Sequence, residues 1–449
     1  MKKRLSLSIF LVLILLMAVS VSAEEVKWDL GGQTIRIQTR WEDVTPLGER
    51  GAHNWYQPDE RLLAHIKSVE EMFNCKIEFV ARGHEGDAWA AIQEGSLLGE
   101  TTVHFAHFSA GMVVPATAGA LHPLNDILDD EFYESYPIMF QYPRLSGDSV
   151  GSTIYGFEAL GHSREARVIM WNKSLFEREG IESLYDIYER GEWTWDKFYE
   201  IARALTKDTD GDGEYDQYGL GALGVKEVYD FLVSNGARFT QIREDGRVEF
   251  DLLRPEFLET MEFLQKIWSE GLVGDGISSN RSRAAMWLDI GTHISNPGRQ
   301  AEFYAIQNDE WGIIPPPQGP NGKGEVNMHT RWVGVIPNTV EDPRAVIEVV
   351  SALFQTREPY IDKEEWEAKW WDRHLWALYD YESFEYLQEA MRNSVLVPDH
   401  VETRVLVVHA EPKAEAVFDQ IIKQGASAAS VLAEWEPVLQ GYLDEMLKQ

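Results

Sequence analysis

Strand-like alternation and helical spacing follow one another along the chain from about residue 33. Residues 33–39 alternate as a half-buried strand does, and apolar residues between 62 and 73 recur with the spacing of one helix face. The same order continues with a strand at 76–81, a helix at 87–98 and a strand at 103–108. Strand, helix and strand at this spacing predict a largely parallel sheet with right-handed crossovers.

The loops after these strands are the first candidates for a binding site. Ligands of open α/β sheets usually lie beyond the carboxyl ends of the strands. The loops at those ends are residues 40–51, 82–86 and 109–111. We therefore expect side chains of these loops to converge on one site.

A second set of elements begins near residue 155. Strands are predicted at 167–171 and 331–336, and residues 256–268 place apolar side chains on one helical stripe. The run of prolines and glycines at 315–322 interrupts regular structure, so we expect it to connect two lobes. Further helices are predicted at 195–205, 343–354, 412–423 and 427–447.

The length and the first residues add the expectation of an exported, two-lobed protein. A chain of 449 residues exceeds what one hydrophobic core usually organises, and 44% hydrophobic residues suffice for two cores. Basic residues at 2–4, an apolar stretch at 5–21 and small residues at 21–23 predict a signal peptide, residues 1–23. No later stretch has ~18 consecutive apolar residues, so no membrane span is expected after signal cleavage.

Cys75 is the only cysteine of the chain. Internal disulfides are therefore excluded, and a cysteine lipid anchor at the mature N-terminus is not expected because Cys75 lies far from the cleavage site. An exported protein without an anchor would be lost from a cell that lacks an outer membrane. We therefore expect a periplasmic or extracellular protein, and favour the periplasm.

The net charge and the aromatic content indicate which classes of partner the protein can bind. The chain has 74 acidic and 41 basic residues, a formal net charge of -33. This charge makes nucleic acid and anionic membrane surfaces poor partners and favours neutral or cationic ligands. The 16 tryptophans and 17 tyrosines offer rings that can stack on the apolar faces of sugars or cover cations.

An aspartate-rich loop follows the helix predicted at 195–205. Its spacing matches positions 1, 3, 5, 7 and 9 of a calcium-binding loop, with Gly213 at the sharp turn. Position 12 is Gly219, where such a loop usually has a bidentate glutamate. The alternative is an Asp-Gly turn with solvated charges, and both interpretations remain open. The candidate ligands are Asp208, Asp210, Asp212, Glu214 and Asp216.

Other short motifs do not indicate an enzyme. Gly219, Gly221 and Gly224 form a G-x-G-x-x-G, but it follows the aspartate-rich loop and does not open a helix after a strand. We therefore reject a dinucleotide site there. The sequence also contains no phosphate-binding P-loop, no H-E-x-x-H and no G-x-S-x-G.

Several segments together resemble one family. Residues 155–157 and 170–180 are similar to "YG.P … YNK.LF...G", and residues 193–219 are similar to "WTWDE … LT.D.dGDG..D.YG". Residues 284–287, 311–317 and 425–432 resemble the "GKAAM", "P.P" and "G..S..E.L" segments. These segments are typical of the extracellular solute-binding proteins of ABC importers, in the carbohydrate-binding group that includes maltose-binding protein.

The resemblance implies an α/β, two-lobed periplasmic-binding-protein fold of type II. Each lobe is then a mostly parallel sheet flanked by helices, with hinge strands between the lobes. The N-terminal lobe is expected from residues 24–157 and 319–370, and the C-terminal lobe from residues 158–318 and 371–449. The implied activity is not catalysis. A monomer captures a sugar or oligosaccharide in the interlobe cleft, closes, and delivers it to the membrane subunits of an ABC permease. No cofactor is required, and a structural Ca²⁺ is one of the two open interpretations of the aspartate-rich loop.

Candidate ligand-binding residues were chosen from the loops and strand ends expected to converge. Tryptophan rings there can stack on a sugar, and charged side chains can bond to its hydroxyls. The candidates are Trp41, Glu42, His107, Phe108, Glu158, Arg164, Trp287, Asp289, Arg331 and Trp332.

Three alternatives remain. A secreted glycoside hydrolase would also be acidic and aromatic, with two carboxylates about 5–10 Å apart across the scissile bond. A receptor of the same fold could instead bind peptides or cationic solutes, which the negative charge would suit. A calcium-dependent adhesion or scaffold protein is the third.

Overall fold

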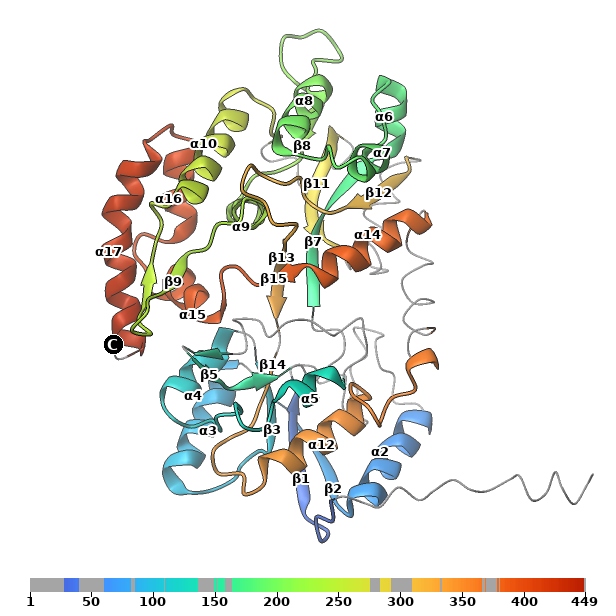
Figure 1. Ribbon diagram of the computed structural model, residues 1–449, viewed down its shortest axis with the longest axis vertical. Helices are drawn as coiled ribbons and strands as arrows, with labels where there is room; N and C mark the ends of the chain where they lie inside the picture. The colour runs from blue at the N-terminus through green and yellow to red at the C-terminus, as the bar shows by residue number, and fades with distance from the viewer. Residues whose placement is uncertain are drawn as a thin grey trace, which may run out of the picture.

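The computed structural model describes residues 28–39, 60–81, 85–108, 110–135, 149–150, 152–157, 164–274, 283–291, 309–331, 333–365, 368, 378 and 380–447. These residues form two lobes, each built on its own sheet (Figure 1). The expected two-lobed α/β architecture is therefore confirmed.

The sheet of the first lobe has the order β2-β1-β3-β14-β6. Strand β1 pairs in parallel with β2 and β3, whereas β14 is antiparallel to β3 and β6. The strands are β1 (Thr34–Thr39), β2 (Lys76–Ala81), β3 (Phe105–Phe108), β6 (Gly156–Phe157) and β14 (Val333–Val335), and β4 (Ser149–Val150) pairs with β5 (Thr153–Ile154) beside them. The helices are α2 (Glu60–Phe73), α3 (Glu85–Leu98), the short 3-10 helix η2 (Ala110–Met112), α4 (Val113–Thr117), α5 (Asp130–Glu134) and α12 (Pro343–Phe354).

The sheet of the second lobe has the order β15-β13-β7-β11-β8, with β12 also paired to β7. Strand β7 runs opposite to its neighbours, and among the described strands of this sheet only β8 with β11 and β15 with β13 pair in parallel, so the prediction of a mostly parallel sheet is wrong for this lobe. The strands are β7 (Arg164–Asn172), β8 (Tyr218–Leu220), β11 (Ala284–Ile290), β12 (Trp311–Ile314), β13 (Val326–Arg331) and β15 (Ser394–Val395), and β9 (Thr240–Ile242) with β10 (Val248–Phe250) forms a separate hairpin.

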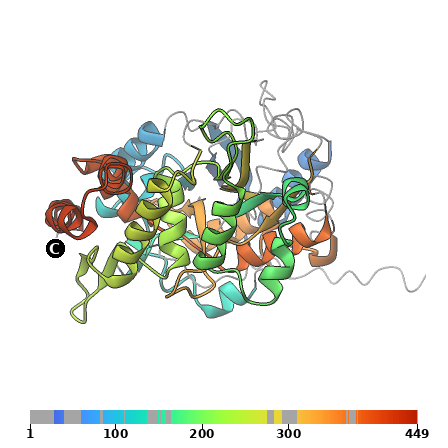
Figure 2. The ribbon, with the colours of Figure 1, turned by 90° about the horizontal axis from the view of Figure 1, so that it is seen from above.

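Helices surround this second sheet. They are α6 (Lys173–Glu179), α7 (Leu184–Glu189), α8 (Trp195–Leu205), α9 (Val225–Ser234), α10 (Pro255–Ser269), α14 (Tyr381–Arg392), α15 (His400–Thr403), the π-helical turn η8 (Arg404–His409), α16 (Ala414–Ile422) and α17 (Ala428–Leu447). The C-terminal helices α16 and α17 lie beside α10, on the left in Figure 1 and again in the view from above in Figure 2. None of the helices in the described ranges combines the length and the apolar character that crossing a bilayer requires.

Local sequence signals account for several of these elements. Strand β2 and helices α8 and α12 have the bounds that periodicity predicts. Helix α8 begins after Thr194, whose side chain accepts a hydrogen bond from the Lys197 amide, and α12 begins after Asp342, which caps it in the same way. The buried residues of α8 recur every three or four positions, so one face packs on the core.

The proline-rich run at 315–322 does not connect the two lobes. It follows β12 and precedes β13, and both strands pair with β7 in the second sheet. Residues 326–331 are therefore hydrogen-bonded into the second lobe, although the predicted N-terminal lobe includes 319–370. The strand predicted at 331–336 is likewise divided between β13 and β14, which belong to different sheets.

The chain passes between the lobes at three places among these elements. It leaves the first sheet after β6, returns between β13 and β14, and leaves again between α12 and α14, which packs on β12 and β7. A single residue, Trp332, separates the end of β13 from the start of β14. The two sheets are thus joined by very short backbone at this point.

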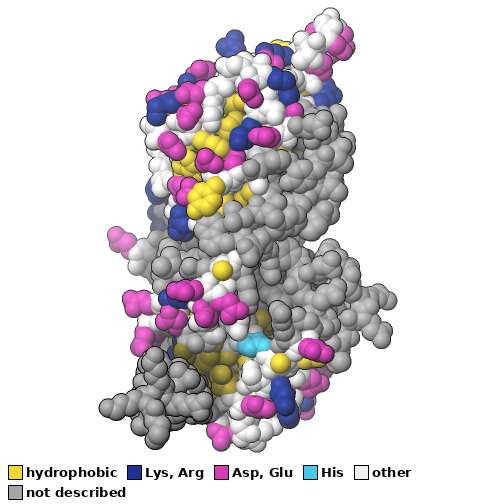
Figure 3. All heavy atoms as spheres, turned by 90° about the vertical axis from the view of Figure 1, so that its right-hand side faces the viewer, with side chains coloured by type: hydrophobic (Ala, Val, Ile, Leu, Met, Phe, Trp, Pro, Cys, Tyr) yellow, Lys and Arg dark blue, Asp and Glu magenta, His cyan; other side chains and the backbone are white. Residues whose placement is uncertain are grey.

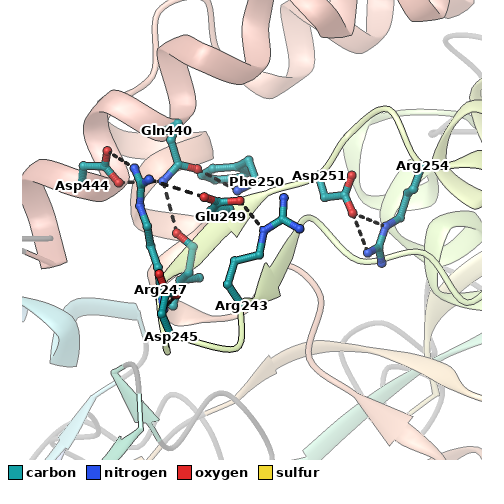
Figure 4. Close-up of polar contacts among 10 residues, drawn as sticks. Arg243, Asp245, Arg247, Glu249, Phe250, Asp251, Arg254, Gln440 and Asp444 are labelled. Atoms are coloured by element: carbon teal, nitrogen blue, oxygen red, sulfur yellow. Dashed lines mark hydrogen bonds and ion pairs between the residues drawn. The ribbon is translucent and has the colours of Figure 1, made fainter.

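Polar contacts bind the β9–β10 hairpin to the C-terminal helix (Figure 4). Arg247 Nη2 lies 2.8 Å from Asp444 Oδ2, and the Phe250 amide donates to Gln440 Oε1 at 2.8 Å. Gln440 Nε2 also donates to the Val248 carbonyl at 3.2 Å.

On the surface, acidic side chains are spread over both lobes with basic ones between them, as one face of the molecule shows in Figure 3.

Candidate functional site

The predicted ligand residues fall into three groups in the structure. Trp41, Glu42, Glu158 and Trp332 lie outside the described residues. Arg164 and Arg331 are described only by their backbone, in β7 and β13. The side chains of His107, Phe108, Trp287 and Asp289 are described.

Strand register brings four of these positions to the junction between the lobes. Arg331, the last residue of β13, pairs with Arg164, the first residue of β7. One residue later, Val333 at the start of β14 pairs with Phe108 at the end of β3, and Gly334 pairs with His107. The carboxyl ends of β1, β2 and β3 and that of β13 therefore meet at the same junction. This is the edge at which open α/β sheets bind ligands.

His107 and Phe108 are both buried at the end of β3. Phe108 has no exposed surface and packs with Met112 and Val333 in the first-lobe core, and His107 is 2% exposed. Phe108 therefore packs in the first-lobe core beside the junction. Asp289 is partly exposed near the end of β11, opposite Val168 of β7.

Trp287 packs against a glycine of the G-x-G-x-x-G. It is 6% exposed, and a Cβ placed on Gly221 would lie 2.2 Å from its indole ring. A Cβ on Gly219 would lie 2.4 Å from the backbone of Ala202 in α8. These two glycines thus permit close packing between β8, β11 and α8, which gives the motif a structural role.

Replacement of Gly221 by alanine is expected to destabilise the protein by about 1–3 kcal/mol, because the new methyl group forces the Trp287 ring out of place. Urea unfolding followed by tryptophan fluorescence measures the change. Gly441→Ala is the matched control: Gly441 lies inside α17 with no atom within 4 Å of an added Cβ. Alanine should stabilise that helix by up to about 1 kcal/mol. Equal stability of Gly221→Ala and the unaltered chain would contradict the packing argument.

A buried ionic cluster beside the junction was not predicted. Arg167 Nε on β7 lies 2.6 Å from Asp230 Oδ2 on α9, and Arg167 Nη2 lies 2.7 Å from Glu227 Oε1. Asn327 Nδ2 on β13 donates to Asp230 Oδ1 at 3.0 Å. The cluster thus ties α9 to two strands of the second sheet. The sequence signal for it was weak, because β7 and α9 carry other charged residues besides Arg167, Glu227 and Asp230.

The protonation of Asp230 is set by its burial. The carboxyl is 1% exposed, and desolvation raises its pKa from 3.8 to about 7, against the lowering effect of Arg167 and with the help of Glu227. Asp289 adds a further negative charge near Arg167. The cluster therefore couples the second lobe near the junction to pH.

Three of the five predicted calcium ligands converge. One carboxylate oxygen from each of Asp208, Asp210 and Asp212 lies within 4.8 Å of the others. Asp208 accepts from the amides of Gly211 at 2.6 Å and Gly213 at 2.8 Å, and these hydrogen bonds lower its pKa. The loop is thus folded around ionised carboxylates. Oxygen ligands of this kind fit a hard cation such as Ca²⁺.

The other two predicted ligands are not in that group. Asp216 accepts from the amide of Thr209 at 2.9 Å and from its hydroxyl at 2.6 Å, and these bonds lower its pKa. The amide of Glu214 donates to Asp212 at 2.8 Å. Among the described residues, the group of converging acidic side chains comprises positions 1, 3 and 5 of the loop pattern.

Comparisons with known proteins agree with this architecture. Residues 89–358 match the family model of the bacterial extracellular solute-binding proteins. A lipoprotein, LipO of Bacillus subtilis (strain 168), is 26% identical over 270 residues, which are 55% of this chain. The chain matches about half the length of that relative, 50%.

Solved structures share the fold at low sequence identity. A sugar transporter from Rhizobium etli in an open conformation has a TM-score of 0.63 at 14% identity and covers 90% of this chain and 98% of its own. The cyclic alpha-maltosyl-1,6-maltose binding protein of Arthrobacter globiformis has a TM-score of 0.60 at 14% identity, covering 92% of this chain and 100% of its own.

The sugar-binding protein MalE of Xanthomonas citri gives a TM-score of 0.60 at 14% identity and covers 92% of this chain and 97% of its own. The match of the family model extends over more than half of the sequence and includes the aspartate-rich loop and most of both sheets. The chain therefore belongs to the bacterial extracellular solute-binding protein family and has the two-lobed fold of its MalE-like members.

Proposed function

We propose that this protein is the substrate-binding receptor of an ABC importer, which captures a sugar or oligosaccharide between its lobes and delivers it to the membrane subunits. The observation that supports this most strongly is the junction at Trp332. There the carboxyl ends of strands from both sheets meet, and one of the three backbone crossings between the lobes is a single residue long. A short connection of this kind permits two rigid bodies to rotate about a hinge.

Two observations support a sugar as the solute: the types of candidate side chain and the names of proteins with a similar fold. The candidate ligand-binding residues include tryptophan, arginine and carboxylate side chains, a combination that stacks on sugar rings and bonds to hydroxyls. Among structures of similar fold, one is named as a binding protein for cyclic alpha-maltosyl-1,6-maltose and another as a sugar-binding protein. Binding without cleavage follows from a receptor role, so no bond of the sugar is broken.

A panel of mono- and oligosaccharides that includes maltotriose tests the proposal by thermal unfolding. A sugar that binds only the folded protein should add about 2.7 kcal/mol of stability at a concentration 100 times its Kd. A reducing-end assay on the same mixtures should give no new reducing ends. New reducing ends would indicate the hydrolase alternative, and stabilisation by peptides or polyamines alone would indicate the cationic-solute alternative.

Trp332→Ala is expected to weaken binding of the stabilising sugar about tenfold or more, since a covered apolar side chain contributes about 1.5–3 kcal/mol. Calorimetric titration measures the affinity. Trp268→Ala is the control, because Trp268 lies on α10 in the second lobe and its ring is covered by Lys423. An affinity unchanged by Trp332→Ala would remove this residue from the proposed site.

The aspartate-rich loop is proposed to hold a structural Ca²⁺ away from the lobe junction. The converging oxygens of Asp208, Asp210 and Asp212 support this. EDTA should then lower the Tm of the unaltered chain but not that of Asp210→Asn, and sugar binding should persist without calcium. Asp245→Asn, in the β9–β10 turn, is the charge-matched control. If EDTA changes no Tm, the loop is an Asp-Gly turn with solvated charges.

Export with cleavage of residues 1–23 is proposed, giving a monomeric protein free of a cysteine lipid anchor. Cys75 is buried in the first-lobe core, where burial raises the pKa of its thiol to about 11. A thiol of this kind is packed and unreactive. Mass spectrometry of the secreted protein should find Glu24 at the N-terminus, and a lipid adduct would contradict the proposal.

A further inference from the structure

A groove lies on the second lobe beside the aspartate-rich loop, between the ends of α8 and α10. Its volume is about 460 Å³, within the range of small-molecule sites. In Figure 1 these helix ends and the loop are at the top of the second lobe, on the side away from the first lobe. The lining residues are Tyr199, Arg203, Thr206, Tyr215, Glu270 and Leu272.

One wall of the groove is held in place by an interlocked set of side chains. The Tyr199 hydroxyl donates to Glu270 Oε2 at 2.7 Å. Lys266 Nζ lies 3.6 Å from the centroid of the Tyr199 ring. These contacts join α8 to the end of α10 and fix a ring and a carboxylate side by side. A site that is ordered before a ligand arrives loses less entropy on binding.

Tyr215, from the aspartate-rich loop, also lines the groove. Its backbone carbonyl accepts from the Tyr218 hydroxyl at 2.6 Å and from Arg283 Nη2 at 3.3 Å. Its ring lies against Gly271, where an added Cβ would be 3.5 Å from the ring. The residue is nevertheless 47% exposed. The loop therefore presents an aromatic surface to solvent from a fixed backbone.

Arg203 offers hydrogen-bond donors that no other described residue accepts. It lies four positions after Tyr199 on α8, which places both on the same helix face. In the described part of the chain its guanidinium has no carboxylate or carbonyl partner, and the residue is exposed. The groove thus has a fixed acceptor in Glu270, unused donors in Arg203 and a ring in Tyr215.

This combination selects a class of ligand. Anions are disfavoured because the carboxylate of Glu270 lines the groove. A purely apolar molecule would leave Arg203 and Glu270 desolvated without partners. A neutral molecule with hydroxyl groups on an apolar ring satisfies all three kinds of group.

We propose that this groove is a second, peripheral carbohydrate site that binds one end of a neutral oligosaccharide. The sugar ring stacks on Tyr215, while its hydroxyls accept from Arg203 and donate to Glu270. The site is separate from the lobe junction and does not depend on the receptor function proposed above. It gives the protein a place to hold a sugar chain from outside as well as between the lobes.

Fluorine NMR of protein containing 3-fluorotyrosine tests the site directly, with maltotriose and cellotriose as probes. The Tyr215 and Tyr199 signals are assigned with Tyr215→Phe and Tyr199→Phe. We expect a saturable shift of the Tyr215 signal with a Kd on the order of 1 mM, typical of a weak site. Arg203→Met should weaken this binding about tenfold, in keeping with the loss of a charge-assisted bond.

Arg243→Met is the matched control, since Arg243 pairs with Glu249 on the distant hairpin and should leave the Tyr215 response unchanged. The affinity of any tight sugar site at the lobe junction, measured by calorimetry, should be the same in Arg203→Met as in the unaltered chain. The proposal is overturned if neither sugar shifts the Tyr215 signal, or if Arg203→Met responds with unchanged affinity. If the unaltered chain binds no sugar tightly in calorimetry but the Tyr215 signal still shifts, the proposed receptor function is wrong and the peripheral site is supported.

Discussion

Arg167→Met is expected to lower the free energy of unfolding by about 3–5 kcal/mol, because it removes the guanidinium that bonds to both Asp230 and Glu227 in a buried cluster. The side chain of Arg167 is 4% exposed and that of Asp230 is 0% exposed, so water cannot replace the lost partner. Urea unfolding at neutral pH measures the loss. The expected site of damage is the contact of α9 with β7, where amide hydrogen exchange should accelerate.

The double variant Arg167→Met/Asp230→Asn is the control for this prediction. Removing both charges takes away the desolvation cost of Asp230 together with its partner, so at least half of the lost stability should return. If the double variant is as unstable as the single one, shape and not charge at position 167 determines the stability.

The pH dependence follows from the same carboxyl. Since its folded pKa is raised to about 7 from 3.8, the folded protein holds a proton that the unfolded chain has released. The contribution of this group to stability is therefore full below about pH 4 and is lost as pH rises through about 7. Asp230→Asn should show a smaller fall in unfolding free energy between about pH 5 and 8 than the unaltered chain. An equal fall in both would assign the pH dependence to other groups.

Glu348→Ala is expected to destabilise the first lobe by about 3–5 kcal/mol. The Glu348 carboxylate, with 4% of its side chain exposed, forms an ion pair with Arg357 and accepts from Arg344 Nε at 3.1 Å. It also accepts from the Tyr360 hydroxyl at 2.9 Å. Without it, the Arg357 guanidinium, with 8% of its side chain exposed, remains buried without a carboxylate in this network. Thermal and urea unfolding measure the loss.

Glu71→Ala on α2 is the control for Glu348→Ala. Glu71 lies 3.7 Å from Lys67, and both side chains are more than two-thirds exposed at 71% and 74%. Exposed pairs of this kind contribute less than about 0.5 kcal/mol, so the control should be nearly neutral. A loss of similar size in both variants would show that burial of the Glu348 network is not what matters.

Much of the fold could be predicted because its signals are local. Strand 76–81 and helices 195–205 and 343–354 agree with the structure, since periodicity and capping residues act over a few neighbouring positions. The candidate site could be predicted less well. Register places Arg164, Arg331 and Phe108 at one junction, yet burial makes Phe108 a packing residue.

The predictions that were wrong concern features that depend on pairing between segments far apart in the sequence. The proline-rich run looks like a crossing between lobes because prolines end regular structure, but only the pairing of β12 and β13 with β7 reveals which lobe the run belongs to. Similarly, Asp230 meets Arg167 across 63 positions of sequence. No periodicity within either element records that partnership.

The sequence by itself determined the class of the protein: alternating strands and helices, two lobes, an aspartate-rich loop and the motifs of one family. These properties depend on residue order over short distances, where backbone geometry and hydrophobic periodicity act directly. Only the tertiary structure decided that β14 inserts antiparallel between β3 and β6, that Gly221 lies beneath Trp287, and that the groove beside Tyr215 exists. Those features depend on close packing between distant segments, and packing is satisfied by the whole fold and not by any one stretch of sequence.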